Sequence, residues 1–572
     1  MRKALFAGLV LTAMAAAAEQ KVTTEFDKIP LGKMVDVVVQ FKALPTLANH
    51  LWVTSGGGKL KREFTRALNG GHYTIPAGLA RILALSDLVK YISLDRSIKG
   101  SMEYANPTVY ANLALSYGYT GTGIGVAVLD SGISTGTAAH PDLKGAGGTG
   151  AVRVVYSESF VPNDTSTNDE YGHGEHIAGI IGGNASQSAG GTGHEFRGIA
   201  PGVNLVNLRV LDRQGGGTDS AVIAAIDRAI ALKAAFNIRI INLSLGRPVL
   251  ESYKLDPLCQ AVERAWKAGI AVVVAAGNAG RVNSNGINGY GTILSPANDP
   301  YVITVGAMRD MSTVTRADDL LASYSSKGPT ALDHIAKPDL VAPGNQIVSL
   351  KLANGTGLAA MTPSPVVSAS YYKTGATSMT PSSYMKLSGT SMAAPMVAGA
   401  AALLLQKYPT MTPDELKAQL MRTASKTFPS YSTYTDTATG VTYTQHYDVF
   451  SVGAGYLDVW AALNAPRTVL GGKRAASPQA LSVPSVGVTL AMGVTIDGTN
   501  VIWGGDPEWG SDDVWGSTFF VTGTNVIWGG DEQVWGNVSL TGNSLLWGTN
   551  VIWGGDEGGG DMGGQSALKG DR

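Results

Sequence analysis

The sequence has a single cysteine, almost no net charge and, beyond its first residues, no long apolar run. Cys259 cannot form an intramolecular disulfide, and its helix-like apolar neighbours predict a buried small side chain. The 43 Lys and Arg residues nearly balance 44 Asp and Glu residues, giving a formal net charge of −1. This balance gives no electrostatic reason to expect nucleic acid or an anionic membrane as a partner. Since no later stretch has about 18 uninterrupted apolar residues, no transmembrane anchor is expected.

The N-terminus has the pattern of an export signal. Arg2 and Lys3 precede an apolar run from Ala4 to Ala15, and small residues at 16–18 precede Glu19. This pattern predicts a secretory signal peptide over residues 1–18 and a secreted or cell-envelope protein. At 572 residues the remainder is long enough for several domains.

Three short segments each contain one residue type needed for nucleophilic catalysis. Asp130 ends an apolar, strand-like run, His173 precedes a small apolar helix, and Ser391 begins a longer apolar helix. A serine hydroxyl needs a neighbouring base to take its proton, and a carboxylate orients a histidine for that role. A helix N-terminus also favours an oxyanion beside Ser391, and we expect Pro395 in the first turn of that helix.

In the order Asp, His, Ser, the chain resembles the subtilisin-like serine proteases. The resemblance runs from about Tyr119 to Leu405 and rests on five segments, which are Asp130 with its strand, 172–174, 242–246, 275–278 and 389–395. It implies a three-layer α/β fold with a mostly parallel sheet and the activity of a serine endopeptidase. It implies that catalysis needs no cofactor and that the substrates are polypeptides.

The resemblance also implies roles for residues after two further strands. Asn278 corresponds to the family's oxyanion donor, with the Ser391 backbone N–H as the second donor. The cleft is expected to be flanked by two segments that pair with the substrate backbone, formed by Ser244, Leu245 and Gly246 and by Ala275, Ala276 and Gly277. We expect residues 295–300 to close the far end of the pocket between them.

Four regions follow from the pattern of strands and helices. After the signal, residues 19–100 show a β, β, α, β pattern that resembles an inhibitory propeptide, with self-cleavage expected between Ile98 and Glu103. Residues 101–466 alternate apolar strands with helices and form the predicted catalytic domain. Residues 467–572 are predicted to be a linker, with a possible processing site at 471–478, and a β-rich Trp/Gly repeat tail.

Three departures from the family pattern stand out. Glu175 lies where relatives carry a small hydroxyl residue, so its charge either raises the pKa of His173 or points outward. Residues 351–386 form a long insertion before Ser391, which we interpret as a surface loop more readily than as a lid. Asp142 matches a calcium-binding position in some relatives, but the partner loop at 184–196 is longer and Gly-rich here, so a structural calcium ion is plausible while its ligands stay unassigned. His140 and His176 are interpreted as structural.

In the tail, a segment ending in Trp-Gly-Gly-Asp recurs every 25 residues, at 498–506, 523–531 and 548–556. Short aromatic runs separated by Gly-Gly-Asp predict strands and tight turns. Three roles stay open for these repeats: binding glycans, attaching the enzyme to a surface, or filling a repetitive core.

Two other classes of function were weighed against a protease. A catalytically silent relative would require a broken site, yet Asp130, His173, Asn278 and Ser391 are all present. A nucleotide-binding α/β protein is suggested by the glycines of 121–125, but these precede the strand, which is the wrong side for a phosphate-binding loop.

Overall fold

The computed structural model divides into two compact units, Met1–Lys99 and Gly100–Arg572. It describes residues 21–22, 26, 29–64, 69–94, 102–282, 289–352, 357–361, 366–435, 442–472, 474–483, 487–490, 495–496 and 499–500. The predicted signal peptide, the cleavage region up to residue 101 and, apart from residues 499–500, the three full Trp repeats lie outside the described residues. Within the part of the chain that is described, no helix is long and apolar enough to cross a membrane.

The first unit is a four-stranded antiparallel sheet with two helices. Its strands follow the spatial order β2-β3-β1-β4, and its elements in chain order are β1 (Met34–Phe41), α2 (Leu47–Ser55), β2 (Lys59–Phe64), β3 (Gly70–Pro76), α3 (Ala77–Ala84) and β4 (Val89–Leu94). Alternate residues of β1, among them Val37, Val39 and Phe41, are buried against the helices. The helix α2 was missed in the sequence, so the order is β, α, β, β, α, β.

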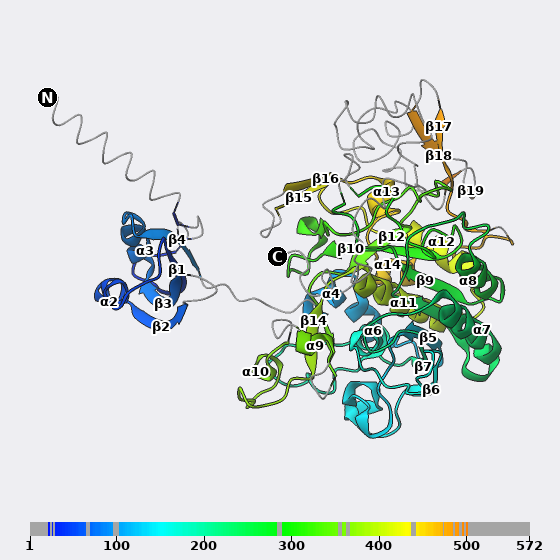
Figure 1. The fold of residues 1–572 in the computed structure, drawn as a ribbon, viewed down its shortest axis with the longest axis horizontal. Helices are drawn as coiled ribbons and strands as arrows, with labels where there is room; N and C mark the ends of the chain where they lie inside the picture. The colour runs from blue at the N-terminus through cyan, green and yellow to red at the C-terminus, as the bar shows by residue number, and fades with distance from the viewer. Residues whose placement is uncertain are drawn as a thin grey trace. The chain divides into compact units, whose positions relative to one another are not determined.

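The second unit contains an eight-stranded sheet (Figure 1). Its strands follow the order β11-β10-β9-β8-β5-β7-β6, with β12 also paired to β10, and all pairs are parallel except β10 with β11. Their bounds are β5 (Gly125–Asp130), β6 (Val154–Ser159), β7 (Asn204–Arg209), β8 (Ile238–Leu243), β9 (Ala271–Ala275), β10 (Ile303–Arg309), β11 (Leu320–Leu321) and β12 (Leu340–Pro343). The predicted mostly parallel α/β sheet is confirmed.

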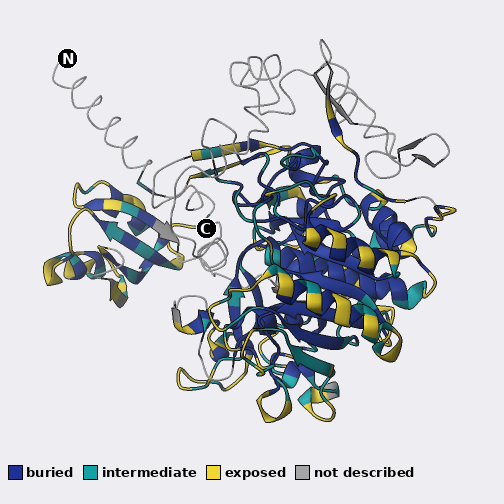
Figure 2. Ribbon diagram, turned by 45° about the vertical axis from the view of Figure 1, so that its right-hand side comes forward, coloured by how far each residue is buried: buried dark blue, intermediate teal, exposed yellow. Residues whose placement is uncertain are grey.

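Helices cover this sheet and leave its central strands buried, as the colouring of Figure 2 shows. The helices α6 (His173–Gly182) and α11 (Thr390–Lys407) pack on each other and on the sheet, while α7 (Asp219–Phe236) and α8 (Pro257–Lys267) form a second contacting pair. Small residues allow the close approach: a Cβ at Gly399 of α11 would collide with Ile199. Cys259 is fully buried in α8, as predicted.

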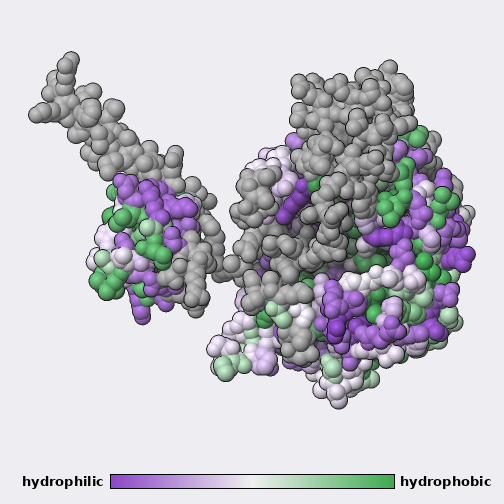
Figure 3. All heavy atoms as spheres, viewed as in Figure 1, coloured by the Kyte–Doolittle hydropathy of each residue, from purple (hydrophilic) through white to green (hydrophobic). Residues whose placement is uncertain are grey.

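The remaining elements are short and lie around this core. They are α4 (Met102–Thr108), α5 (Ala111–Ser116), β13 (Ile347–Leu350), α9 (Leu358–Met361), α10 (Ala369–Tyr372), β14 (Tyr384–Leu387), α12 (Pro413–Arg422), β15 (Tyr431–Thr435), β16 (Thr442–His446), α13 (Val449–Val452), α14 (Val459–Asn464), β17 (Ala480–Val483), β18 (Gly487–Leu490), β19 (Thr495–Ile496) and β20 (Thr499–Asn500). The visible faces of both units mix hydrophilic and hydrophobic side chains (Figure 3).

Residues just beyond the predicted end of the catalytic domain pack onto it instead of forming a linker. Ser477 is buried, and its hydroxyl donates to Asp339 at 2.5 Å. Asp339 also lies 2.7 Å from Lys337 and 3.0 Å from Lys417, both fully buried. Backbone hydrogen bonds from Ser477 to Pro300 and from Ala480 to His334 hold the chain to the catalytic unit as far as Ala480.

Candidate active site

The first half of the site joins the end of a strand to the start of a helix. Asp130 is the last residue of β5, and His173 is the first residue of α6. Asp130 Oδ1 lies 2.7 Å from His173 Nδ1 and also accepts the Ser131 N–H at 2.8 Å. Gly174 permits this approach, because a Cβ at that position would collide with the carbonyl oxygen of Gly132.

Charge around His173 favours its protonated form. Burial lowers its pKa, but the charge and hydrogen bond of Asp130 and the charge of Asp169 outweigh that cost, so the pKa of His173 is raised. By contrast, burial and the neighbouring His173 lower the pKa of His176 to about 3, and its Nε2 lies 3.1 Å from the Ile347 carbonyl. His176 is therefore neutral and faces away from the reaction, in agreement with its structural interpretation.

Two residues that the sequence reasoning missed hold the acid loop and the His173 helix together. The Ser131 hydroxyl donates to Asp169 Oδ1 at 2.9 Å and accepts the Gly174 N–H at 2.9 Å. Asp169 also accepts the N–H groups of Gly172 at 2.8 Å and Glu175 at 2.8 Å. In the first turn of α6, Asp169 therefore satisfies the free N–H of Glu175 and Ser131 satisfies that of Gly174. The only sequence signal was that Ser131 directly follows Asp130.

The serine of the site is held at the start of α11 by the segment after β8. Ser391 is the second residue of the helix, and its hydroxyl donates to the Ser244 carbonyl at 3.1 Å. Pro395 is the sixth residue, so its expected place in the first turn was wrong. A proline there removes the N–H that would bond to the Ser391 carbonyl. The Ser244 hydroxyl donates to that carbonyl instead, at 2.8 Å.

Sheet register brings the two halves of the site together. β5 and β8 are parallel neighbours in which Val128 is level with Asn242, and continuing this register places Asp130 level with Ser244. Neighbouring strands lie about 4.8 Å apart. Ser391, bound to Ser244, and His173, bound to Asp130, are therefore anchored at adjacent strand ends.

Asn278 follows β9 and contacts the same helix start. Its Oδ1 accepts the Thr390 N–H at 2.9 Å and lies 3.1 Å from the Thr390 hydroxyl, which leaves its Nδ2 as the donor for a further partner. A Cβ at Gly389 would be 3.2 Å from that nitrogen. The amide is thus oriented by α11 and lies beside the residues that precede Ser391.

The two predicted substrate-binding segments lie at the ends of neighbouring strands. Residues 244–246 follow β8 and residues 275–277 end and follow β9, and the two strands are paired. Residues 294–295 connect them, because Leu294 N donates to Ala276 O at 3.1 Å and Ser295 exchanges two hydrogen bonds with Arg247. A Cβ at Gly246 or at Gly277 would press on Leu294. These glycines therefore allow both segments to pack closely against Leu294.

The long insertion is not a simple surface loop, and that interpretation was wrong. Its end forms β14, which pairs with β13, and its Tyr372 and Tyr384 are buried against Phe196. Its Leu358 N–H donates to the Tyr171 carbonyl at 2.8 Å, two residues before His173. The aromatic rings give this segment its own packing, which the Ser/Thr/Tyr-rich composition did not reveal.

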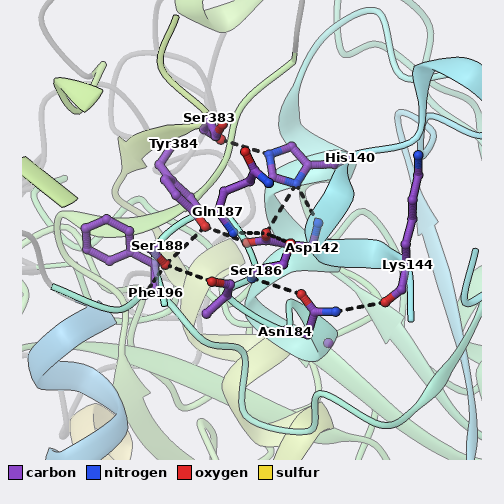
Figure 4. A network of polar contacts seen from close by, with 12 residues as sticks. His140, Asp142, Lys144, Asn184, Ser186, Gln187, Ser188, Phe196, Ser383 and Tyr384 are labelled. Atoms are coloured by element: carbon purple, nitrogen blue, oxygen red, sulfur yellow. Dashed lines mark hydrogen bonds and ion pairs between the residues drawn. The ribbon is translucent and has the colours of Figure 1, made fainter. Parts of the chain in front are cut away.

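The oxygens of Asp142 are already occupied by protein donors (Figure 4). Its Oδ1 accepts from the Ser186 hydroxyl at 2.8 Å and the Gln187 N–H at 2.9 Å, and its Oδ2 accepts from the Tyr384 hydroxyl at 2.6 Å. The Asn184 side-chain oxygen accepts the Ser186 N–H at 3.0 Å.

The carbonyl oxygens nearby are occupied as well. The Arg153 guanidinium donates to the carbonyls of Asp142, Lys144, Gly182 and Val203. Calcium needs six to eight oxygen ligands. These residues do not fit a calcium ion, and among the described residues no group of three or more His, Cys, Asp or Glu side chains forms a metal site.

A parallel α/β sheet with a carboxylate–imidazole pair beside a helix-terminal serine is typical of serine hydrolases. Residues 121–455 match the Subtilase family of S8 peptidases. The chain belongs to this family, and it is a serine endopeptidase.

Curated relatives agree with this assignment. The chain is 36% identical to serine protease AprX of Bacillus subtilis over 376 residues, which is 64% of this chain and 76% of AprX. It is 33% identical to subtilisin DY of Bacillus licheniformis over 331 residues, covering 58% of this chain and 94% of that protein. The crystal structure of a cold adapted subtilisin-like serine proteinase covers 60% of this chain and 90% of its own, with 29% identity and a TM-score of 0.39.

Proposed function

We propose that this protein is a secreted serine endopeptidase that uses Asp130, His173 and Ser391 as its catalytic triad. The observation that carries the proposal is the 2.7 Å contact between Asp130 and His173, at the strand end adjacent to the one that holds Ser391. No cofactor takes part in the reaction. The polypeptide substrate lies in extended form between segments 244–246 and 275–277.

The reaction follows from the positions of these groups. The Ser391 hydroxyl turns from the Ser244 carbonyl to His173 Nε2, gives up its proton and attacks the scissile carbonyl. Asp130 holds the imidazole by Nδ1 and stabilises its charge. The Asn278 amide and the Ser391 backbone N–H donate to the oxyanion. His173 then protonates the leaving amine, and water releases the acyl group by the same steps in reverse.

The enzyme is made as a precursor. The contact boundary at Lys99/Gly100 and the separate apolar core of the first unit support residues 19–100 as an intramolecular inhibitor. The export pattern of residues 1–18 and the secreted subtilisins among its relatives support secretion. Self-cleavage falls between Ile98 and Glu103. A glycan or surface role for the repeats of 498–556 stays a prediction.

A fluorophosphonate probe together with casein tests this function. The wild-type protein is expected to take up the probe once and to degrade casein, while Ser391→Ala does neither and accumulates at precursor length. Thr390→Ser, which keeps a hydroxyl beside the nucleophile, is a matched control and keeps the label. If Ser391→Ala is still labelled and active, the proposed mechanism is wrong.

A further inference from the structure

Glu175, the departure from the family pattern, is buried beside the catalytic pair. It is the third residue of α6 and only 1% exposed, which excludes the outward orientation. Its Oε2 accepts the Ser134 N–H at 2.7 Å. Ser134 belongs to the loop that begins after Asp130, so the side chain links this loop to the first turn of the helix that carries His173.

The contact is one of three between the same two segments. Asp130 bonds to His173, the Ser131 hydroxyl accepts the Gly174 N–H, and the Ser134 N–H donates to Glu175. Consecutive residues of α6 therefore hold successive parts of the acid loop. Of the three contacts, the last depends on the Glu175 side chain, at a position where the family pattern usually has a small hydroxyl residue.

A second buried carboxyl group, that of Asp169, lies close to Glu175. Asp169 accepts four hydrogen bonds, from Ser131, Tyr171, Gly172 and Glu175, and it lies at a helix N-terminus. Burial raises the pKa of Asp169, and both features oppose that rise by stabilising its anion. Glu175 has fewer donors and faces the charge of Asp169, so of the two it is the group that keeps a proton.

We propose that Glu175 is a positioning residue for the catalytic pair and that it acts in its protonated form, as a neutral clamp between the acid loop and the His173 helix. This proposal rests on the proposed triad. It predicts that the contact between the acid loop and the His173 helix weakens as pH rises. At high pH Glu175 loses its proton, and a second carboxylate then lies next to Asp169 in a site with little water.

The groups around Glu175 set the pH at which it loses its proton. Burial raises the pKa of Glu175 to about 8, the Ser134 hydrogen bonds oppose the rise, and the charge of Asp169 adds to it. His173, on the same helix, is influenced by Asp130 and Asp169. Below about pH 8 the clamp is neutral and His173 keeps its partners. Above that pH, charge repulsion weakens the contact of Glu175 with the acid loop.

The test compares pH profiles of kcat/KM for hydrolysis of a peptide substrate by three variants. Glu175→Gln keeps a neutral acceptor for Ser134, so we expect activity within about threefold of wild type near neutral pH and no decline around pH 8. Glu175→Ala removes the acceptor, and we expect a loss of about tenfold at every pH. Glu195→Gln, an exposed carboxylate paired with Arg197, is the control and keeps the wild-type profile.

Stability provides a second measurement, made in the Ser391→Ala background to prevent autolysis. The raised pKa of Glu175 means that its stabilising contribution is complete below its ordinary value of 4.5 and is lost as pH rises toward about 8. The loss is expected to be absent in Glu175→Gln. An unchanged alkaline limb in Glu175→Gln would overturn the proposal, as would wild-type activity in Glu175→Ala. Labelling of wild-type Ser391 by the fluorophosphonate probe at neutral pH separates the two proposals. If Ser391 is not labelled, the triad is wrong; if it is labelled but the Glu175 variants behave as described above, only the Glu175 proposal is wrong.

Discussion

Removing the Tyr384 hydroxyl tests whether the protein itself satisfies the Asp142 site. Tyr384→Phe keeps the ring in its contacts with Phe196 and Tyr372 and deletes one donor, 2.6 Å from Asp142 Oδ2. Asp142 is fully buried, so the oxygen is left without this donor and without water. A buried hydrogen bond to a charged acceptor contributes about 1.5–3 kcal/mol, and its loss is expected to lower the free energy of unfolding by that amount.

The assay is thermal unfolding followed by circular dichroism in the Ser391→Ala background. A loss of about 2 kcal/mol in the free energy of unfolding corresponds to a decrease in Tm of roughly 2–4 °C for a catalytic unit of this size, because the entropy of unfolding grows with chain length. It also corresponds to about 30-fold in the unfolding equilibrium. Phe196→Leu, which alters the same cluster without touching Asp142, separates the effect of ring packing from that of the hydroxyl.

A chelator completes the experiment. Because protein donors already bind the Asp142 oxygens and Arg153 binds the neighbouring carbonyls, excess EDTA or added calcium is expected to leave the wild-type Tm unchanged. The reasoning is refuted if EDTA lowers the wild-type Tm as much as Tyr384→Phe does. It is refuted equally if metal analysis finds bound calcium in wild type that Asp142→Asn lacks.

Two further predictions concern the catalytic groups. Asn278→Ala is expected to lower kcat by about 100- to 1000-fold with little change in KM, because the proposed role of its Nδ2 is to donate to the oxyanion of the transition state. Steady-state kinetics on a peptide substrate checks this, and an equal rise in KM contradicts it. Asp130 and Asp169 raise the pKa of His173 despite its burial, so kcat/KM should fall at acid pH with a pKa above 6.5. Asp169→Asn should shift this acid limb of the pH profile to lower pH. If the acid limb does not move, the charge of Asp169 does not act on His173.

Strand ends were the part of the site that the sequence predicted well. Asp130 and Asn278 follow apolar β-branched runs, and parallel strands bring their carboxyl ends to one edge of the sheet. His173 and Ser391 begin apolar helices as expected. These positions depend on local periodicity and chain order, which a single sequence contains.

Contacts between segments distant in the chain were not predictable in the same way. The Ser131–Asp169 hydrogen bond crosses 38 positions, and the bond of Tyr384 to Asp142 crosses 242. No periodicity connects such residues. For the same reason Ser477 was assigned to a linker, because its bond to Asp339 across 138 positions has no local signature.

The position of Ser391 shows how local and distant constraints combine. Pro395 interrupts the hydrogen bonding of α11 at the carbonyl of Ser391, and the Ser244 hydroxyl fills the gap. Ser244 is in turn held by the Asn242 side chain at 3.0 Å, on the strand adjacent to the one that ends at Asp130. An irregularity in the helix therefore fixes the nucleophile to the sheet. The same sheet edge carries Asp130, so Ser391 and Asp130 share one support, whereas His173 lies on α6 and is linked to the acid loop through Asp130, Ser131 and Glu175.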